Sequence, residues 1–373
     1  MKKMLFIAFA TTMILISSVA TYAQAAFNTG EIGVYVGEYG RFQIYTPDTA
    51  ITSTIQLERL SILVGVGPNA VFDYQLDVEV EEPVVNVSNP LISDYEIYGS
   101  FNNTYSFEPP DVFEQLNVYG WNSESYTIIK FTITNRETSP LEGALIGLEI
   151  IPYLDGEYGY DTVTYDGTNE IIRSHRGGTN LGYKLLSHDL SSLYSFEYYS
   201  GYYADTSFWN WLNYGSLQPQ YASNTADGPV TITAQDPIVL NPNASIEVYY
   251  GVAVGTTEAE MISNMEAATQ KYYSITSVKT DHNSVPDSYI LEQNYPNPFN
   301  PSTAIKFGIP EASNVRLKIF NALGEEVAEL VNEYLDAGTY TYSFDASQLT
   351  SGIYVYTLQT GDQLISKKMT LIK

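Results

Sequence analysis

Apolar and polar residues alternate along several segments of this 373-residue chain, and this alternation constrains the fold more than any other feature. Successive side chains of a strand point to opposite faces, so such segments are predicted strands with one buried face. They span residues 72–80, 129–134 and 246–254, while residues 144–151 are apolar enough for a strand buried on both faces. Short polar breaks between strands favour an antiparallel arrangement. We predict a mainly β fold whose body is a large antiparallel β-sandwich, either one sandwich or two.

One segment near the end of the body has helical periodicity instead. Thr257 and Glu260 fit a capping box, and apolar residues then recur at helical spacing. We therefore predict a helix over about residues 258–273 that closes an acidic, tyrosine-rich body of residues 26–275. Residues 276–290 are polar and aperiodic, which indicates an interdomain linker.

A proline-rich stretch, NYPNPFNPST, follows the linker. Each Asn-Pro step keeps the chain extended and removes a backbone donor, so this stretch cannot continue the ladder of the preceding domain. We expect a rigid clamp in which Tyr295 and Phe299 dock onto the unit that follows. About seven short strands in about eighty residues then predict a small immunoglobulin-like β-sandwich over residues 291–373.

The first 25 residues resemble an export signal. Lys2 and Lys3 precede an apolar run from Leu5 to Ala20, and Ala23-Gln24-Ala25 fits an A-x-A cleavage site. These features are typical of a secretory signal peptide, and the short run argues against a membrane anchor. No later segment is apolar and long enough to span a bilayer, so we expect no transmembrane segment in the mature form.

Charge and cysteine content narrow the classes of function. The chain has 17 basic and 43 acidic residues, a net charge of −26, and most of the acidity lies in the body. This balance argues against nucleic acid or anionic membranes as partners, because both require a positive surface. The absence of cysteine excludes disulfides, thiolate metal sites and cysteine nucleophiles, which suits an exported chain.

Four C-terminal stretches carry a specific resemblance: YPNPFNPST, VRLKIFNALGEEVAELV, AGTYTYSFDASQLTSGIYVY and KKMTLIK. Through them residues 291–373 resemble the type A C-terminal sorting domain of the type IX (Por) secretion system of the Bacteroidota. The resemblance implies passage through the periplasm and an outer-membrane translocon, then removal of the domain by a sortase-like peptidase. The protein would be secreted or held on the outer cell surface, where lipopolysaccharide is a partner of such cargo.

The resemblance also implies which residues carry the sorting signal: Gly338, Ser351, Gly352, Tyr354, Lys367 and Lys368. We expect Gly338 and Gly352 to occupy tight turns that need a positive φ or close backbone approach. Residues 133–186 resemble, more weakly, β-rich regions of other cargo of this pathway. Those regions are mostly uncharacterised and imply no activity.

Four carboxylates in an acidic, glycine-rich segment form the candidate metal site: Asp155, Glu157, Asp161 and Asp166. Oxygen ligands on turns are what calcium requires, although the spacing is not that of an EF-hand loop. The segment is either a calcium site or a set of acidic turns. Calcium is the one cofactor that the sequence suggests.

Residues 193–215 contain ten aromatic side chains. If this segment is a strand, Trp209 and Trp211 point the same way and, with Tyr202 and Tyr203, form a platform for glycans or for assembly. The alternative is a cluster that packs in the core and under loops.

Few residues suggest catalysis. The histidines are His175, His188 and His282, and neither a G-x-S-x-G motif nor a helical metal-binding pair accompanies them. We therefore predict no catalytic residues. Arg173 and Arg176 form a basic island that either binds an anionic sugar or offsets neighbouring carboxylates.

We predict a non-catalytic secreted or cell-surface protein that binds glycan or matrix, or assembles with itself. The alternative is a secreted carbohydrate-active hydrolase with paired carboxylates in a cleft. A third hypothesis is a calcium-stabilised surface-layer-type subunit, whose melting temperature would rise with calcium.

Overall fold

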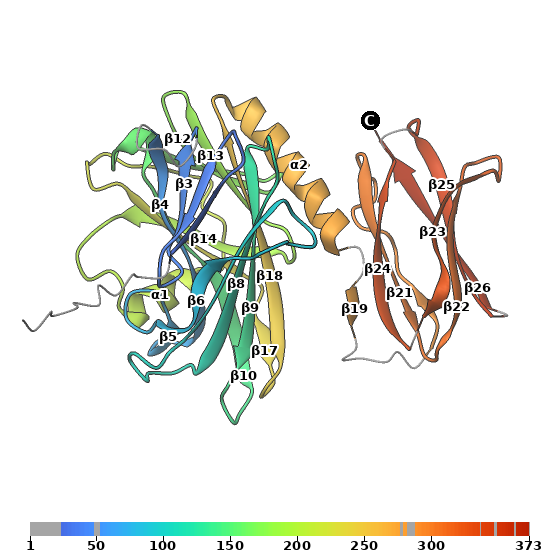
Figure 1. The fold of residues 1–373 in the computed structure, drawn as a ribbon, viewed down its shortest axis with the longest axis horizontal. Helices are drawn as coiled ribbons and strands as arrows, with labels where there is room; N and C mark the ends of the chain where they lie inside the picture. Colours follow the sequence, from blue (N-terminus) through green and yellow to red (C-terminus); the bar gives the residue numbers. More distant parts are fainter. Residues whose placement is uncertain are drawn as a thin grey trace, which may run out of the picture.

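The computed structural model describes residues 24–47, 53–276, 279–281, 288–335, 337–346, 349–361 and 363–372. Residues 1–23, which hold most of the predicted signal peptide, and His282 lie outside the described residues. Strands dominate and form a large body followed by a smaller C-terminal sandwich (Figure 1), which confirms the predicted mainly β class. No helix among the described residues has the length and apolar character needed to cross a membrane.

Within residues 24–47 and 53–276, the body consists of two antiparallel sheets of nine strands each. The strands of the first sheet are β1 (Ala25–Asn28), β2 (Gly33–Val36), β3 (Phe42–Thr46), β4 (Thr54–Gly67), β5 (Ala70–Phe72), β10 (Leu141–Pro152), β14 (Leu190–Glu197), β16 (Pro229–Gln235) and β17 (Ile238–Leu240). Their order is β1-β2-β3-β4-β10-β16-β14, with β5 beside β4 and β17 beside β10.

The second sheet has a single continuous order. Its strands are β6 (Glu79–Asn86), β7 (Tyr95–Asn102), β8 (Val112–Gly120), β9 (Tyr126–Asn135), β11 (Thr162–Asp166), β12 (Ile171–Arg176), β13 (Thr179–Leu185), β15 (Gln220–Ala222) and β18 (Ser245–Gly255). They run in the order β15-β11-β12-β13-β18-β9-β8-β7-β6.

One hydrophobic core lies between the two sheets, so the body is a single sandwich. Buried residues of β4 and β10 in the first sheet share this core with buried residues of β8, β9 and β18 in the second. β10 is buried almost throughout, as its continuous apolar run predicts, and β9 has the predicted strand with alternating burial. β18 forms the predicted strand, but one buried face is wrong for it, because the helix over residues 258–276 covers its other face. The burial of so many large apolar side chains is the main favourable term in folding.

The predicted strand over residues 72–80 is wrong in its middle. β5 ends at Phe72 and β6 begins at Glu79, with a turn between them. The Asp73 carboxylate accepts hydrogen bonds from the backbone N–H groups of Gln75 (2.6 Å) and Leu76 (3.0 Å), and Asp73 N–H donates to Asp77 (2.9 Å). These hydrogen bonds between side chains and backbone replace the ladder hydrogen bonds of a strand. The apolar residues keep a period of two through the turn, although no strand forms there.

The closing helix is confirmed as α2 (Glu258–Thr276). Thr257 Oγ1 accepts a hydrogen bond from Glu260 N–H (3.2 Å), as in a capping box, while the Glu260 carboxylate accepts one from Thr256 N–H (2.9 Å). The helix buries Met261, Met265 and Ala268 in a cluster with aromatic residues of the second sheet. It runs along the side of the body that faces the C-terminal sandwich (Figure 1).

The C-terminal sandwich has two four-stranded sheets and its own core. Its strands are β19 (Lys279–Asp281), β20 (Ile290–Leu291), β21 (Ser302–Ile309), β22 (Ser313–Phe320), β23 (Glu326–Leu335), β24 (Gly338–Asp345), β25 (Gly352–Thr360) and β26 (Gln363–Leu371). The sheet orders are β19-β24-β21-β20 and β23-β22-β25-β26. The predicted small sandwich is thus confirmed, while its immunoglobulin-like type stays a prediction. One of its strands, β19, lies inside the segment that we predict as a linker.

The proline-rich stretch is anchored by one aromatic residue rather than two. Phe299 is 2% exposed, and its backbone N–H donates to Thr370 O at 2.9 Å. Tyr295 pairs with Ala304 through its backbone, but its side chain is 66% exposed. The predicted docking is therefore correct for Phe299 and wrong for Tyr295, whose ring lies beside the body instead.

Candidate functional site

A candidate cleft lies over Arg59 on β4, beside the turn that follows β5. It comprises two hollows, of about 370 and about 440 Å³, and Arg59 and Gln75 line both. The other lining residues of the first hollow are Glu58, Ile151, Tyr158, Tyr198, Ala226 and Asp227. Those of the second are Tyr39, Tyr74, Val78, Glu79 and Tyr105.

A buried ion pair forms the floor of this cleft. Arg59 Nε lies 3.0 Å from Glu149 Oε2, and Arg59 Nη2 lies 3.2 Å from Oε1. Glu149 is 1% exposed and also accepts a hydrogen bond from Ser61 Oγ at 3.1 Å. A buried ion pair needs such additional hydrogen bonds to offset the desolvation of its charges. The floor therefore carries no net charge.

Tyr202 completes the floor from below. Its hydroxyl donates to Glu149 and accepts from Arg59 Nη2 at 2.8 Å and from Gln75 Nε2 at 3.1 Å. Burial, and then the charge of Glu149, raises the pKa of the Tyr202 hydroxyl above its ordinary value. The hydroxyl therefore stays protonated and fixes the positions of Arg59 and Gln75.

Two loops pack together to form the wall of the first hollow. Gly159 has φ +83°, and a Cβ there would lie 2.3 Å from Thr225 O, so only glycine allows this approach. Tyr160 N–H donates to Thr225 O at 3.0 Å, which ties the loops together. Tyr158 precedes Gly159 on the first loop, and Tyr198 is tied to the second by its N–H, which donates to Gly228 O at 3.0 Å. The two tyrosines, 41% and 43% exposed, line the same hollow.

The turn that replaces the predicted strand forms the wall of the second hollow. Tyr74 lies on this turn, with its ring centroid 5.2 Å from the Arg59 guanidinium carbon. Ser106 Oγ donates to Asp77 at 2.5 Å and so joins the turn to the loop that carries Tyr105. Tyr105 is 69% exposed and therefore offers most of its ring to a ligand.

Two further carboxyl groups are buried near the cleft. Asp73 is fully buried, and burial, together with the charges of Asp77 and Glu149, raises its pKa to about 8. Glu114, on β8, is 5% exposed, and burial raises its pKa to about 8. Both groups are therefore largely protonated at neutral pH. The acidic residues that line the cleft itself are Glu58, Glu79 and Asp227.

The predicted aromatic platform has a different structure from the one expected. Trp209 and Trp211 lie on α1 (Asp205–Leu212), so the strand on which their common face depended does not form. The Trp211 ring stacks on Phe196 with centroids 3.9 Å apart, and Tyr203 packs beside the same cluster. Tyr202 is fully buried under the cleft, so its ring cannot serve as an exposed platform. Tyr198, from the same sequence segment, lines the cleft instead.

The four candidate calcium ligands have separate partners. Asp155 accepts a hydrogen bond from Thr179 Oγ1 (2.6 Å), and buried Asp161 lies 2.8 Å from Arg176 Nε. Asp166 caps its own turn by accepting from Thr168 N–H (2.9 Å), and the Glu157 side chain is 80% exposed. Within the described ranges, no group of three or more His, Cys, Asp or Glu residues could hold a metal ion. Calcium binding stays a prediction from the sequence.

The basic island offsets carboxylates. Arg173 Nη1 lies 2.6 Å from Glu258 Oε2, and Arg176 pairs with Asp161 as described. His175 lies beside these arginines on β12, where burial, and then the charge of Arg173, lowers its pKa. These contacts favour the second interpretation, in which the arginines neutralise neighbouring acids.

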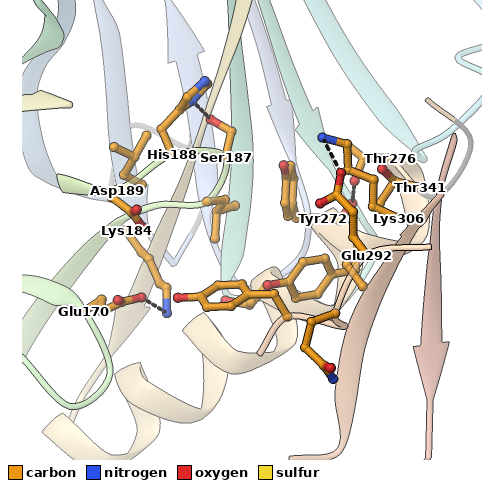
Figure 2. A pocket seen from close by; sticks show the side chains of 17 residues that line it. Glu170, Lys184, Ser187, His188, Asp189, Tyr272, Thr276, Glu292, Lys306 and Thr341 are labelled. Atoms are coloured by element: carbon orange, nitrogen blue, oxygen red, sulfur yellow. Dashed lines mark hydrogen bonds and ion pairs between the residues drawn. The ribbon is translucent and has the colours of Figure 1, made fainter. Parts of the chain in front are cut away.

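A separate hollow of about 390 Å³ lies between the body and the C-terminal sandwich. Figure 2 shows the Lys184–Glu170 pair (3.6 Å) on the body and the Lys306–Glu292 pair (3.4 Å) on the C-terminal sandwich. Ser187 Oγ lies 2.7 Å from His188 Nδ1 and accepts a hydrogen bond from Tyr249 N–H at 2.9 Å. The ion pairs thus lie within each part and line a polar gap between them.

The predicted sorting-signal residues occupy the second half of the C-terminal sandwich. Tyr354 is buried, with its hydroxyl donating to Thr350 O at 2.8 Å, and exposed Ser351 precedes β25. Lys367 and Lys368 lie on the edge strand β26. Gly338 begins β24 opposite Ile309. The expectation of a tight turn is wrong for Gly352, where φ is not positive and a Cβ would meet nothing closer than 3.9 Å.

Comparison with known families identifies the C-terminal sandwich. Residues 293–373 match the family described as the secretion system C-terminal sorting domain. This match confirms the resemblance seen in the sequence, and the chain is a cargo of the type IX secretion system. The sorting domain indicates export to the cell surface or secretion.

Several solved structures are similar to this chain at low scores. A bacterial glucoamylase complexed with acarbose is 13% identical with a TM-score of 0.47, and the match covers 69% of this chain and 37% of that enzyme. A putative aldose 1-epimerase from Escherichia coli K12 is 10% identical with a TM-score of 0.33, covering 62% of this chain and 99% of that one.

PorZ, a surface component of the type IX system of Porphyromonas gingivalis, is 10% identical with a TM-score of 0.18, covering 94% of this chain and 58% of that one. No curated protein matches the sequence. Likenesses at these scores assign no activity.

Proposed function

We propose that the body of this exported protein binds a neutral glycan in the cleft over Arg59 and does not transform it. The supporting observation is that Tyr158 and Tyr198, both more than 40% exposed, line the same hollow as Arg59 and Gln75. A hollow of about 370 Å³ falls within the range of small-molecule sites, which combine aromatic walls with a few fixed polar groups.

This combination suits the chemistry of a sugar. A pyranose ring has an apolar face of C–H groups that packs on an aromatic ring, while its hydroxyl groups need hydrogen-bond partners at the edge. Tyr158 and Tyr198 offer the rings, and Arg59 and Gln75 offer polar groups held in place by Glu149 and Tyr202. Such fixed partners bind at a lower entropic cost than mobile side chains.

The charges of the cleft favour a neutral ligand. Glu149 neutralises Arg59, so the floor attracts neither sign of charge strongly. Glu58 is paired with Arg41, whereas Asp227 is exposed at the rim. An anionic sugar would approach these carboxylates and a strongly acidic protein, which is unfavourable.

The alternative function, a carbohydrate-active hydrolase, requires a different arrangement of side chains in the cleft. Such an enzyme needs two carboxyl groups that reach the scissile bond from opposite sides. Here Asp73 and Glu114 are buried, and Glu149 is 1% exposed and occupied by Arg59. Of the carboxylates that line the cleft, Glu58 is paired with Arg41, and Asp227 and Glu79 line different hollows. Among the described residues, neither hollow is therefore lined by two carboxylates free of an ion pair, as such an enzyme requires.

A glycan array probed with the purified protein tests the proposal. We expect binding to one class of neutral glycan, and at least tenfold weaker binding for Tyr198→Ala. Tyr334→Ala is the matched control, because Tyr334 is 65% exposed on the C-terminal sandwich. An array without signal, or a signal that Tyr198→Ala and Tyr334→Ala leave equally intact, would reject the proposal. Release of reducing ends from a bound glycan would favour the hydrolase.

A further inference from the structure

We infer that the cleft binds an oligosaccharide, with successive sugar units on either side of Arg59 and Gln75; this inference rests on the proposed function. Its basis is that the two hollows share these two lining residues, whereas each has tyrosines of its own. The hollows therefore adjoin at Arg59 and Gln75, and a ligand that fills both would lie across these two residues.

The shared floor offers a hydrogen-bond donor and an acceptor side by side. Among the described residues, the contacts of Arg59 use Nε and Nη2, so Nη1 is the nitrogen left for a ligand. Gln75 donates through Nε2 to Tyr202 and Glu149, which leaves its Oε1 as an acceptor. A sugar hydroxyl both donates and accepts, so this pair suits the hydroxyl groups next to a glycosidic linkage.

Each hollow also has its own aromatic surface. Tyr158 and Tyr198 belong to the first hollow, and Tyr39, Tyr74 and Tyr105 belong to the second. Tyr105 is 69% exposed and comes from a different loop, which the Ser106–Asp77 hydrogen bond holds beside the cleft. One sugar unit can use one set of rings, while a chain of units can use both sets at once.

The test compares oligosaccharides of increasing length from the glycan class found on the array, titrated against the whole protein. We expect the affinity to rise at least tenfold from the monosaccharide to the oligosaccharides, because the second hollow is then filled. Tyr105→Ala should weaken oligosaccharide binding about tenfold. Phe107→Ala is the matched control, since Phe107 lies on the same loop, is 78% exposed and does not line either hollow.

The outcomes separate this inference from the proposed function. A monosaccharide that binds as tightly as its oligomers, together with an unaffected Tyr105→Ala variant and a weakened Tyr198→Ala variant, would overturn the inference and leave glycan binding intact. Absence of binding to any neutral glycan would overturn both. Melting curves of all variants establish that a loss of affinity is not a loss of fold.

Discussion

Arg59 and Glu149 are 90 positions apart in the sequence, yet they form an ion pair with Arg59 Nε 3.0 Å from Glu149 Oε2. The pairing of β4 with β10 brings them together, since Ile151 lies opposite Arg59 in the register. The pair fixes the floor of the cleft, because the Arg59 guanidinium and the Gln75 amide both bind to Glu149 and Tyr202.

Glu149→Gln should destabilise the protein strongly. The change leaves the buried Arg59 charge without its partner, and breaking a buried pair in this way costs about 3–5 kcal/mol. Chemical denaturation measures the free energy of unfolding. Lys306→Gln is the control, because both side chains of the Lys306–Glu292 pair are about half exposed and such pairs contribute at most about 1 kcal/mol. Equal losses in the two variants would contradict a structural role for the Arg59–Glu149 pair.

Much of the strand pattern was predictable, because apolar residues alternate along β9 and β18. Burial follows this alternation in the second half of β9, whereas β18 is buried on both faces from Val248 onward. The turn after Phe72 could not be predicted, because the sequence alternates there as in a strand. Side-chain hydrogen bonds of Asp73 and Asp77 stabilise the turn instead. The α1 helix was also missed. Its aromatic residues favour strands by propensity, and packing against β4 and β16 overrides that preference.

The cleft itself was beyond prediction from the sequence. Arg59 and Glu149 occur in apolar strands where nothing marks them as partners, and only the tertiary structure pairs them. The aromatic segment gave the one usable signal, since Tyr198 and Tyr202 both belong to it. The choice of Trp209 and Trp211 within that segment depended on a strand that does not form there.

Asp73→Asn should change how stability depends on pH. The folded state keeps the Asp73 proton up to about pH 8, whereas the unfolded chain loses it near pH 4. The carboxyl therefore favours folding fully below about pH 4, and this contribution is lost as the pH rises to about 8. Asparagine keeps the acceptor for Gln75 and Leu76 but does not ionise. The variant should gain stability relative to the original protein as the pH rises from 5 to 8.

Asp166→Asn is the control, because its stability relative to the original protein should change with pH in the opposite direction. Burial raises the pKa of Asp166, but hydrogen bonds from Asn169 and Thr168 outweigh it and lower the pKa. The ionised form therefore stabilises the fold above the ordinary carboxyl pKa, and the variant should lose stability relative to the original protein as the pH rises through the acidic range. Thermal unfolding between pH 3 and pH 9 measures both trends, and parallel curves for all three proteins would contradict them.

Gly159→Ala should damage the first wall of the cleft. The added Cβ would meet Thr225 O at 2.3 Å, so the two loops must separate. Gly201→Ala is the matched control, because Gly201 also has a positive φ (+86°) but has open space around its Cβ position. The control should lose about 1–2 kcal/mol from backbone strain alone. Gly159→Ala should lose more stability and also weaken glycan binding, and identical behaviour of the two variants would rule out the loop contact as the cause.

Deletion of residues 293–373 should stop export in a bacterium that has the type IX system. The sorting domain has its own core, so its removal leaves the body core intact. Cell fractionation should then find the folded body in the periplasm, whereas the complete protein reaches the surface or the medium. Surface exposure of the truncated protein would contradict the assigned role of the C-terminal sandwich.

Isothermal titration of the purified protein with the best oligosaccharide from the array tests the central claim most directly. The account predicts saturable binding that weakens at least tenfold in both Tyr158→Ala and Tyr198→Ala, with Tyr334→Ala unchanged. Binding that survives both cleft substitutions would contradict the assignment of the cleft as the glycan site.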